Sequence, residues 1–274
     1  MRIPASIIFW TLAFLLVFPQ AGLSQEGQTE ARALLDRLEK AHAEISGFSS
    51  PLTYRKEYAL EGDFETRIGT VALRGSGVDR EVILTFDRII DASGHGTDES
   101  GFHLYEGGWW TEVDPRRKRV VLRQVVEPGA QRDPFEIGEG PLPLPFGQKS
   151  VNVLERFDVS VVEVPDEPLF KGINDAHVLR LTPKPHTKIA EDHESLDLLF
   201  ETNTLLPLGI LVVHRSGDRT TAWLRSPKAD TNEEAFTGRA AEAKKLLEAA
   251  STDPNWTVDR KPLPSKAIIS EDGS

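Results

Sequence analysis

The chain has 274 residues, no cysteine and a formal net charge of −11. Without cysteine it has no disulfides, no thiolate catalysis and no lipid-modified N-terminal cysteine. The acidic balance opposes binding to nucleic-acid phosphates or to an anionic membrane surface.

The N-terminus has the pattern of a signal peptide. Met1-Arg2 gives a short positive region, residues 7–18 are apolar, and Ala21-Gly-Leu-Ser24 offers small residues for cleavage. We expect a signal peptide over residues 1–24, cleaved after Ser24. An uncleaved anchor is the alternative, although the apolar run is shorter than the roughly 20 residues that span a bilayer.

Residues 25–264 are predicted to form a single domain, followed by a flexible polar tail at residues 265–274, because no linker divides the chain and no internal repeat is found. Residues 30–45 repeat apolar side chains at three- and four-residue spacing, which is typical of an amphipathic helix. Three strands are then expected, at residues 52–60, 66–73 and 81–90.

Residues 101–126 have the pattern of a meander of short strands, with Gly-Gly and Asp-Pro turns between them. The next segment, residues 133–148, is rich in proline and glycine but also carries large apolar side chains. Proline cannot donate a ladder hydrogen bond, so a long strand is excluded there. An apolar loop beside a sheet either closes one end of a core or covers a ligand cavity.

A second meander is predicted for the remaining half of the chain. A short helix is expected at residues 149–157 and a longer one, rich in alanine, glutamate and lysine, at about residues 232–250. The strands are expected at residues 158–164, 177–182, 194–202, 205–213, 219–225 and 256–258. About eleven or twelve short antiparallel strands with few helices suggest a barrel or a strongly curved sheet.

No local pattern supports an enzyme. The seven histidines are scattered without the helical pair of a zinc site, and no G-x-S-x-G elbow occurs. The acidic run Glu191-Asp-His-Glu194 is interpreted as a solvated strand entry. We expect no catalytic residues, no metal, no cofactor and no nucleic-acid partner. The basic run Arg116-Arg-Lys-Arg119 is interpreted as a solvated hairpin tip, with an anionic docking point as the alternative.

Several short motifs follow one another in an informative order. They are the N-terminal helix leading to Phe48, the Leu104-Tyr-Glu-Gly-Gly-Trp-Trp110 strand pair, the Asp133-Pro-Phe-Glu-Ile-Gly138 break, the Leu179-Arg-Leu-Thr-Pro-Lys184 strand, and Leu205-Leu-Pro-Leu-Gly209 followed by Ser216-Gly-Asp218. Because these motifs follow one another in this order, the chain resembles the outer-membrane lipoprotein carriers and their lipoprotein-sorting relatives (LolA-like).

The resemblance implies a mainly β fold: an unclosed (half) antiparallel β-barrel of about 11 strands with an N-terminal helix and a helix/loop lid. Its apolar face would hold acyl chains, which need no directed chemistry because each buried CH₂ contributes about 0.8 kcal/mol. The family's lid is tethered by an arginine, for which Arg55, Arg67 and Arg80 are candidates. The cavity and lid candidates are Phe86, Leu104, Trp109, Trp110, Leu122, Phe135, Leu144, Phe146, Leu198, Phe200 and Ile210.

The leading hypothesis is a non-enzymatic periplasmic carrier, or chaperone, that binds acyl chains of lipoproteins or related lipids and moves them toward the outer membrane. It would act as a monomer, with an inner-membrane release complex and an outer-membrane acceptor as partners. The first alternative is a sensor or scaffold of the same fold that recognises envelope proteins without carrying lipid. The second is a secreted hydrolase whose site is assembled from distant residues.

Overall fold

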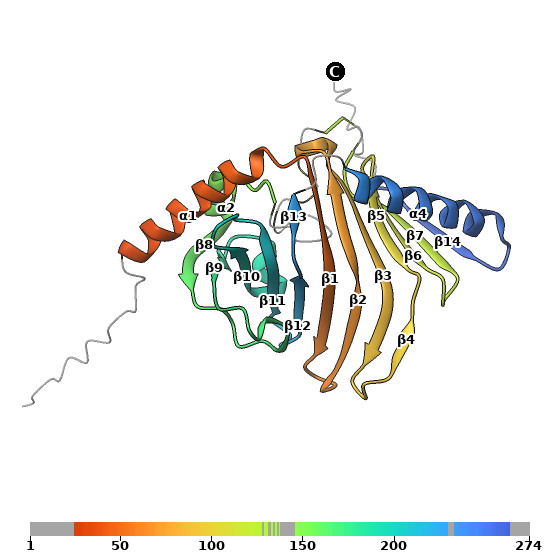
Figure 1. Cartoon of the computed structure of the whole chain (residues 1–274), viewed down its shortest axis with the longest axis horizontal. Coiled ribbons are helices and arrows are strands. Elements are labelled where there is room, and N and C mark those ends of the chain that lie inside the picture. The colour runs from red at the N-terminus through yellow and green to blue at the C-terminus, as the bar shows by residue number, and fades with distance from the viewer. Residues whose placement is uncertain are drawn as a thin grey trace, which may run out of the picture.

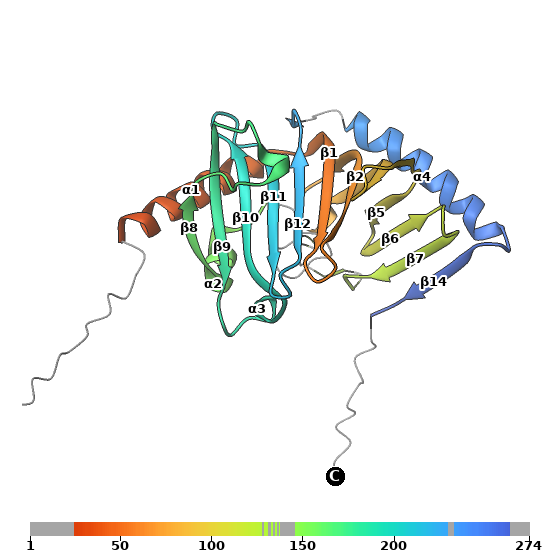
Figure 2. The ribbon, with the colours of Figure 1, turned by 90° about the horizontal axis from the view of Figure 1, so that it is seen from below.

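The computed structural model describes residues 25–127, 129–130, 133, 135, 137, 146–229 and 233–263 (Figure 1). The predicted signal peptide and polar tail lie outside these residues, so both stay predictions. One large sheet dominates the described part of the chain, with helices against it (Figures 1 and 2). Among the described residues, no helix is both long and apolar enough to cross a membrane.

All the described strands belong to one sheet. Its strands are β1 Gly47–Tyr58, β2 Asp63–Arg74, β3 Glu81–Asp91, β4 Gly96–Asp98, β5 Phe102–Glu106, β6 Trp109–Asp114, β7 Arg119–Gln124, β8 Phe157–Val162, β9 Ala176–Pro183, β10 His193–Glu201, β11 Pro207–His214, β12 Arg219–Leu224, β13 Lys228–Ala229 and β14 Thr257–Lys261. Their order is β14-β7-β6-β5-β3-β2-β1-β12-β11-β10-β9-β8, with β13 beside β1 and β4 beside β3. The end strands β14 and β8 do not pair in the described structure, so the predicted mainly β, unclosed fold is confirmed.

The helices lie against this sheet. They are α1 Gln25–Ala43, α2 Ser150–Arg156, α3 Ile189–Asp192 and α4 Glu234–Thr252, with two 3₁₀ turns, η1 Gly77–Asp79 and η2 Pro168–Phe170. The three longer ones, α1, α2 and α4, correspond to the helices expected from the sequence. α1 starts earlier and ends two residues sooner than predicted, because the chain already enters β1 at Gly47.

The strands expected from the sequence, about eleven or twelve, are present, and the short strands β4 and β13 are additional. The expectation that all strands run antiparallel is wrong for β14, which pairs with β7 in parallel, Val258 opposite Val120. The reason lies in α4, which carries the chain from β13 to the far edge of the sheet. β14 therefore enters that edge in the same direction as β7 (Figure 2).

One face of the sheet, which we call the inner face, carries two apolar clusters. Alternate residues of β1 to β3, among them Phe48, Val71 and Leu84, form the first cluster. Residues of β8 to β11 form the second with the apolar side of α1. Ala222 of β12 packs against both clusters, so they share one face and adjoin at the middle of the sheet.

The opposite face, which we call the outer face, is also apolar. Ile83 and Leu104 pack under Phe236 and Ala240 of α4, whose small alanines let the helix approach the strands closely. At the other end of the sheet, Phe170 of η2 covers β9 to β11. Both faces of the central strands are therefore covered, which agrees with the nearly continuous apolar run at residues 205–213.

Gly69 allows β2 and β3 to approach closely at a β-bulge. The register shifts between Ile68 and Gly69, and a Cβ at Gly69 would lie against the backbone carbonyl of Thr85 and 2.9 Å from the Cα of Phe86. Only glycine fits this contact without moving the backbone.

We expect Gly69→Ala to lower the free energy of unfolding by about 2 kcal/mol or more, since the added methyl group meets backbone rather than a movable side chain. The control is Gly238→Ala in α4, where a Cβ meets nothing within 4 Å. This variant should gain about 0.5–1 kcal/mol from helix propensity. Urea unfolding measures both, and equal stability of the two variants would contradict the bulge's role.

Candidate functional site

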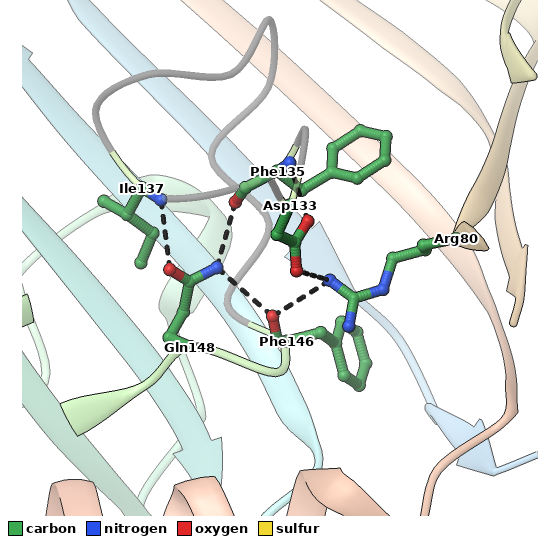
Figure 3. A network of polar contacts seen from close by, with 6 residues as sticks. All are labelled: Arg80, Asp133, Phe135, Ile137, Phe146 and Gln148. Atoms are coloured by element: carbon green, nitrogen blue, oxygen red, sulfur yellow. Dashed lines mark hydrogen bonds and ion pairs between the residues drawn. The ribbon is translucent and has the colours of Figure 1, made fainter. Parts of the chain in front are cut away.

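The candidate site lies on the inner face, where the two apolar clusters adjoin. Here the described residues of the proline-rich segment lie over the sheet, beside the end of α1 and the start of β3 (Figure 3). We call Asp133, Phe135, Ile137, Phe146 and Gln148 the segment anchors, because they fix both ends of this segment to the fold.

Three anchors bury large apolar side chains on the inner face. Phe135 and Ile137 are fully buried, and Phe146 is 3% exposed. Phe135 meets Tyr105 edge-on with ring centroids 4.8 Å apart, and Phe146 meets Phe48 edge-on at 4.5 Å. Because Phe135 and Phe146 join the β1–β3 cluster while Ile137 joins the cluster under α1, the segment connects the two halves of the inner face.

Arg80 tethers the segment to the sheet. It lies between η1 and β3, and its side chain is 5% exposed. Its Nη1 donates to Asp133 Oδ2 at 3.0 Å and to the Phe146 carbonyl at 3.2 Å, so one guanidinium holds both ends of the segment (Figure 3). Burial lowers the pKa of Arg80 and the Asp133 charge opposes that shift, which identifies Asp133 as its counter-ion.

Gln148 organises the backbone of the segment. Its Nε2 donates to the carbonyls of Phe135 at 2.9 Å and Phe146 at 3.2 Å, while its Oε1 accepts from the Ile137 amide at 3.0 Å (Figure 3). An amide side chain suits this position because it both donates and accepts. The buried backbone of the anchors is thereby satisfied without a strand.

His42 connects α1 to the same place. Its Nε2 lies 2.8 Å from the Leu205 carbonyl, and its ring centroid lies 5.2 Å from Phe146 and 5.8 Å from Phe200. Burial, with a smaller contribution from the Arg80 charge, lowers the pKa of His42. The imidazole is therefore neutral at pH 7 and packs as an apolar ring with one polar edge.

A further contact joins α1 to α2, immediately after the segment. The amide and hydroxyl of Ser150 donate to Glu39 Oε2 at 2.9 and 2.7 Å. The backbone hydrogen bond is the main reason that the pKa of Glu39 is lowered. The chain that leaves the segment is thus fixed to the helix that covers half of the inner face.

An aromatic and polar strip continues the inner face from this site. His103 lies edge-on between Phe86 and Trp110, with ring centroids 5.4 and 5.6 Å away. Burial lowers the pKa of His103 to about 4. Glu112 accepts hydrogen bonds from Trp110 Nε1 at 3.1 Å and Arg123 Nη1 at 2.9 Å, so the strip ends in charge next to an apolar surface.

The structure divides the predicted cavity residues between the two faces. On the inner face lie Phe86, Trp110, Phe135, Phe146, Leu198, Phe200 and Ile210. Leu104 and Leu122 lie on the outer face under α4, and Trp109 also faces outward, with the Arg260 guanidinium 4.3 Å from its ring centroid. These three cannot line one cavity with the others, because neighbouring strand residues point to opposite faces. Leu144 lies outside the described residues, and ligand binding by any of these side chains stays a prediction.

The latch candidates are distinguished by their partners. Arg55 pairs with Glu57 at 2.6 Å, and Arg67 pairs with Glu65 at 2.7 Å. Among the described contacts of these three, Arg80 is the one that reaches the segment anchors.

Two residues of the site, Gln148 and His42, were not predicted. His42 continues the apolar stripe of α1 at the four-residue spacing set by Leu34 and Leu38, a signal that the sequence does contain.

No family model matches the sequence, and no similar curated protein was found. Similar solved structures include an uncharacterized conserved protein from Thermus thermophilus, 13% identical over 85% of this chain and 99% of that one, with a TM-score of 0.43. Another is the MucA/MucB complex from Pseudomonas aeruginosa, 15% identical over 75% of this chain and 60% of that one, at 0.40. A third is a LolA superfamily protein from Nitrosomonas europaea, 11% identical over 73% of this chain and 93% of that one, at 0.30.

The chain is similar to LolA superfamily proteins. The family named from the order of the motifs is thus among the solved structures to which the chain is similar. All three TM-scores are below 0.5, so the proposals below rest on the side chains of this protein.

Removing the Arg80 tether should release the segment. We expect Arg80→Met to lower the free energy of unfolding by about 2–3 kcal/mol, because Asp133 loses its buried counter-ion. Hydrogen exchange at the Ile137 amide should accelerate. The control is Arg123→Met, since Arg123 is 48% exposed in its pair with Glu112 and should cost less than about 1 kcal/mol. If both variants lost the same small free energy of unfolding, and hydrogen exchange at the Ile137 amide stayed unchanged, the role of Arg80 as a tether would be contradicted.

Stability should also fall in mild acid. The pKa of His103 is lowered to about 4 and that of His42 moves in the same direction. The unfolded chain therefore binds more protons below about pH 6.5, and the free energy of unfolding should decrease by on the order of 2 kcal/mol as the pH falls toward about 4. Urea unfolding followed by tryptophan fluorescence checks this. His103→Gln should flatten the dependence of the free energy of unfolding on pH. If that dependence is the same in the variant, His103 is not its source.

Proposed function

We propose that the chain is a non-enzymatic periplasmic carrier that binds the acyl chains of lipoproteins or related lipids on its inner face. The observation that carries this proposal concerns the segment anchors Phe135, Ile137 and Phe146. Their side chains are buried in the two inner-face clusters, and Arg80 tethers the segment to which they belong. An acyl chain that took their place would bury a similar apolar surface, at about 0.8 kcal/mol per CH₂.

The tether suits a cover that opens and closes. Burying a guanidinium costs solvation free energy that its ion pair only partly returns, so the closed state gains little from the pair itself. When the segment moves away, Arg80 and Asp133 regain water. Apolar packing of the anchors therefore supplies most of the closing free energy, and an acyl chain competes for that same packing.

The neighbouring strip would receive the polar end of an amphiphile. His103 and Trp110 present rings beside the apolar cluster, and Glu112 and Arg123 follow at its edge. Such a passage from apolar to charged surface matches a molecule with a tail and a polar head. In this proposal the chain is exported by residues 1–24, acts as a monomer, and passes cargo from a release complex at the inner membrane to an acceptor at the outer membrane.

The test uses a photoactivatable fatty acid and maps the labelled residues by mass spectrometry. We expect labels on inner-face residues such as Phe48, Phe86 and Trp110 and none on the outer-face residues Phe102 and Val113. Phe146→Ala should change the affinity for a fluorescent fatty acid at least several-fold. Its control, Phe236→Ala, removes an equally buried ring on the outer face and should leave that affinity unchanged.

Both alanine variants should lose about 3–5 kcal/mol of stability, so affinities are compared where each remains folded. Labelling of both faces alike, or no binding of either probe, would refute acyl binding. A purified protein that binds no lipid but forms a stable complex with an envelope protein would favour the sensor or scaffold instead.

A further inference from the structure

A cavity lies on the outer face, away from the segment anchors. It has a volume of about 230 Å³ and opens between the first turns of α4 and the strands β1, β2 and β13. Its lining residues are Ser49, Ser50, Pro51, Thr70, Val71, Ser226, Lys228, Ala235 and Arg239. The volume is below the roughly 300 Å³ at which pockets for drug-sized ligands begin, so the cavity suits a small group rather than an acyl chain.

The charge of this cavity is opposite to that of the protein. Two lining residues, Lys228 and Arg239, are cations, and no carboxylate is among the described lining residues, although the whole chain carries −11. Two other cations near α4 are paired, Arg74 with Glu81 and Lys244 with Glu106.

Neither cation of the cavity has a carboxylate partner in the described structure. The Lys228 side chain makes no hydrogen bond or ion pair with a described residue, and Arg239 donates from Nη1 to the Thr85 hydroxyl at 3.3 Å. Two cations that line one small cavity without a carboxylate partner among the described residues repel each other, and an anion between them would relieve that repulsion.

Hydroxyl groups complete the lining. Ser49 lies opposite Lys228 in the pairing of β1 with β13, so the sheet fixes these two positions next to each other. Thr70 is linked at 2.7 Å to the Thr85 hydroxyl that also holds Arg239. The hydroxyls of Ser49 and Ser226 make no hydrogen bond to another described residue. The cavity therefore offers an ammonium, a guanidinium and free hydroxyl groups on strands and a helix of defined position.

We propose that this cavity binds a phosphate group, carried by inorganic phosphate or by a phosphate monoester. A guanidinium presents a planar pair of donors to phosphate oxygens, while an ammonium acts as a point charge, and the two together recognise a dianion. The neighbouring apolar side chains of Pro51 and Ala235 keep one side of the anion away from water, which strengthens its interaction with both cations. The site lies opposite the acyl-binding face and does not depend on that function.

Isothermal titration of the full chain with inorganic phosphate tests the site, against sodium chloride of the same ionic strength. We expect saturable binding, weakened at least tenfold by Lys228→Gln and by Arg239→Gln, and several-fold by Ser49→Ala. The control is Lys245→Gln, which removes an exposed cation of α4 that does not line the cavity and should bind like the wild type. Because Lys228 is exposed, its variant should fold normally.

Two further ligands separate the sources of the phosphate. Stronger binding of glycerol 3-phosphate than of inorganic phosphate identifies a soluble monoester. Binding of phosphatidic acid vesicles that is lost in Lys228→Gln and kept in Lys245→Gln identifies a lipid headgroup. The proposal is overturned if none of the three phosphates binds, or if Lys228→Gln and Lys245→Gln bind each of them equally.

Discussion

A sheet that is apolar on both faces must be covered on both, and this constraint organises the whole structure. Strands β1 to β3 carry Phe48, Val71 and Leu84 on one side and Ala72 and Ile83 on the other. The outer face receives α4, whose alanines fit closely against the strands. The inner face receives α1 over one half and the segment anchors over the other. The two covers of the inner face differ in kind. α1 is a continuous helix, whereas the segment anchors belong to a proline-rich segment that is fixed at a few points.

The two covers also differ in how their backbone hydrogen bonds are satisfied, which bears on the function proposed for the inner face. A helix satisfies its own backbone hydrogen bonds, whereas the anchors depend on Gln148 and Arg80 for theirs. Local opening is easiest where few polar contacts and separate apolar side chains hold a segment. The anchor Phe146 lies at the point where the segment meets α1 and β10, next to the rings of His42 and, through His42, Phe200.

Much of this fold could be predicted from periodicity, and the failures have physical causes. Alternation found the long strands, and helical spacing found α1, α2 and α4. Alternation within a strand does not say which face is which, so Leu104 and Leu122 were grouped with Phe86 although they point the other way. The parallel pairing of β14 depends on where α4 crosses the sheet, which no local pattern encodes. Arg80 could be listed but not distinguished from Arg55 and Arg67, because ion pairs depend on distant neighbours.

The pairing of β14 with β7 has a consequence for biosynthesis. β7 is made well before β14, so the edge of β7 that pairs with β14 stays open until Lys261 has been made. Until α4 follows, Phe102, Leu104 and Val113 also lack their cover. A nascent chain therefore exposes a strand edge and an apolar face together, the two features that promote aggregation. This half of the sheet reaches its native state only after α4 and β14 have been made, so residues 234–261 protect it while the chain folds.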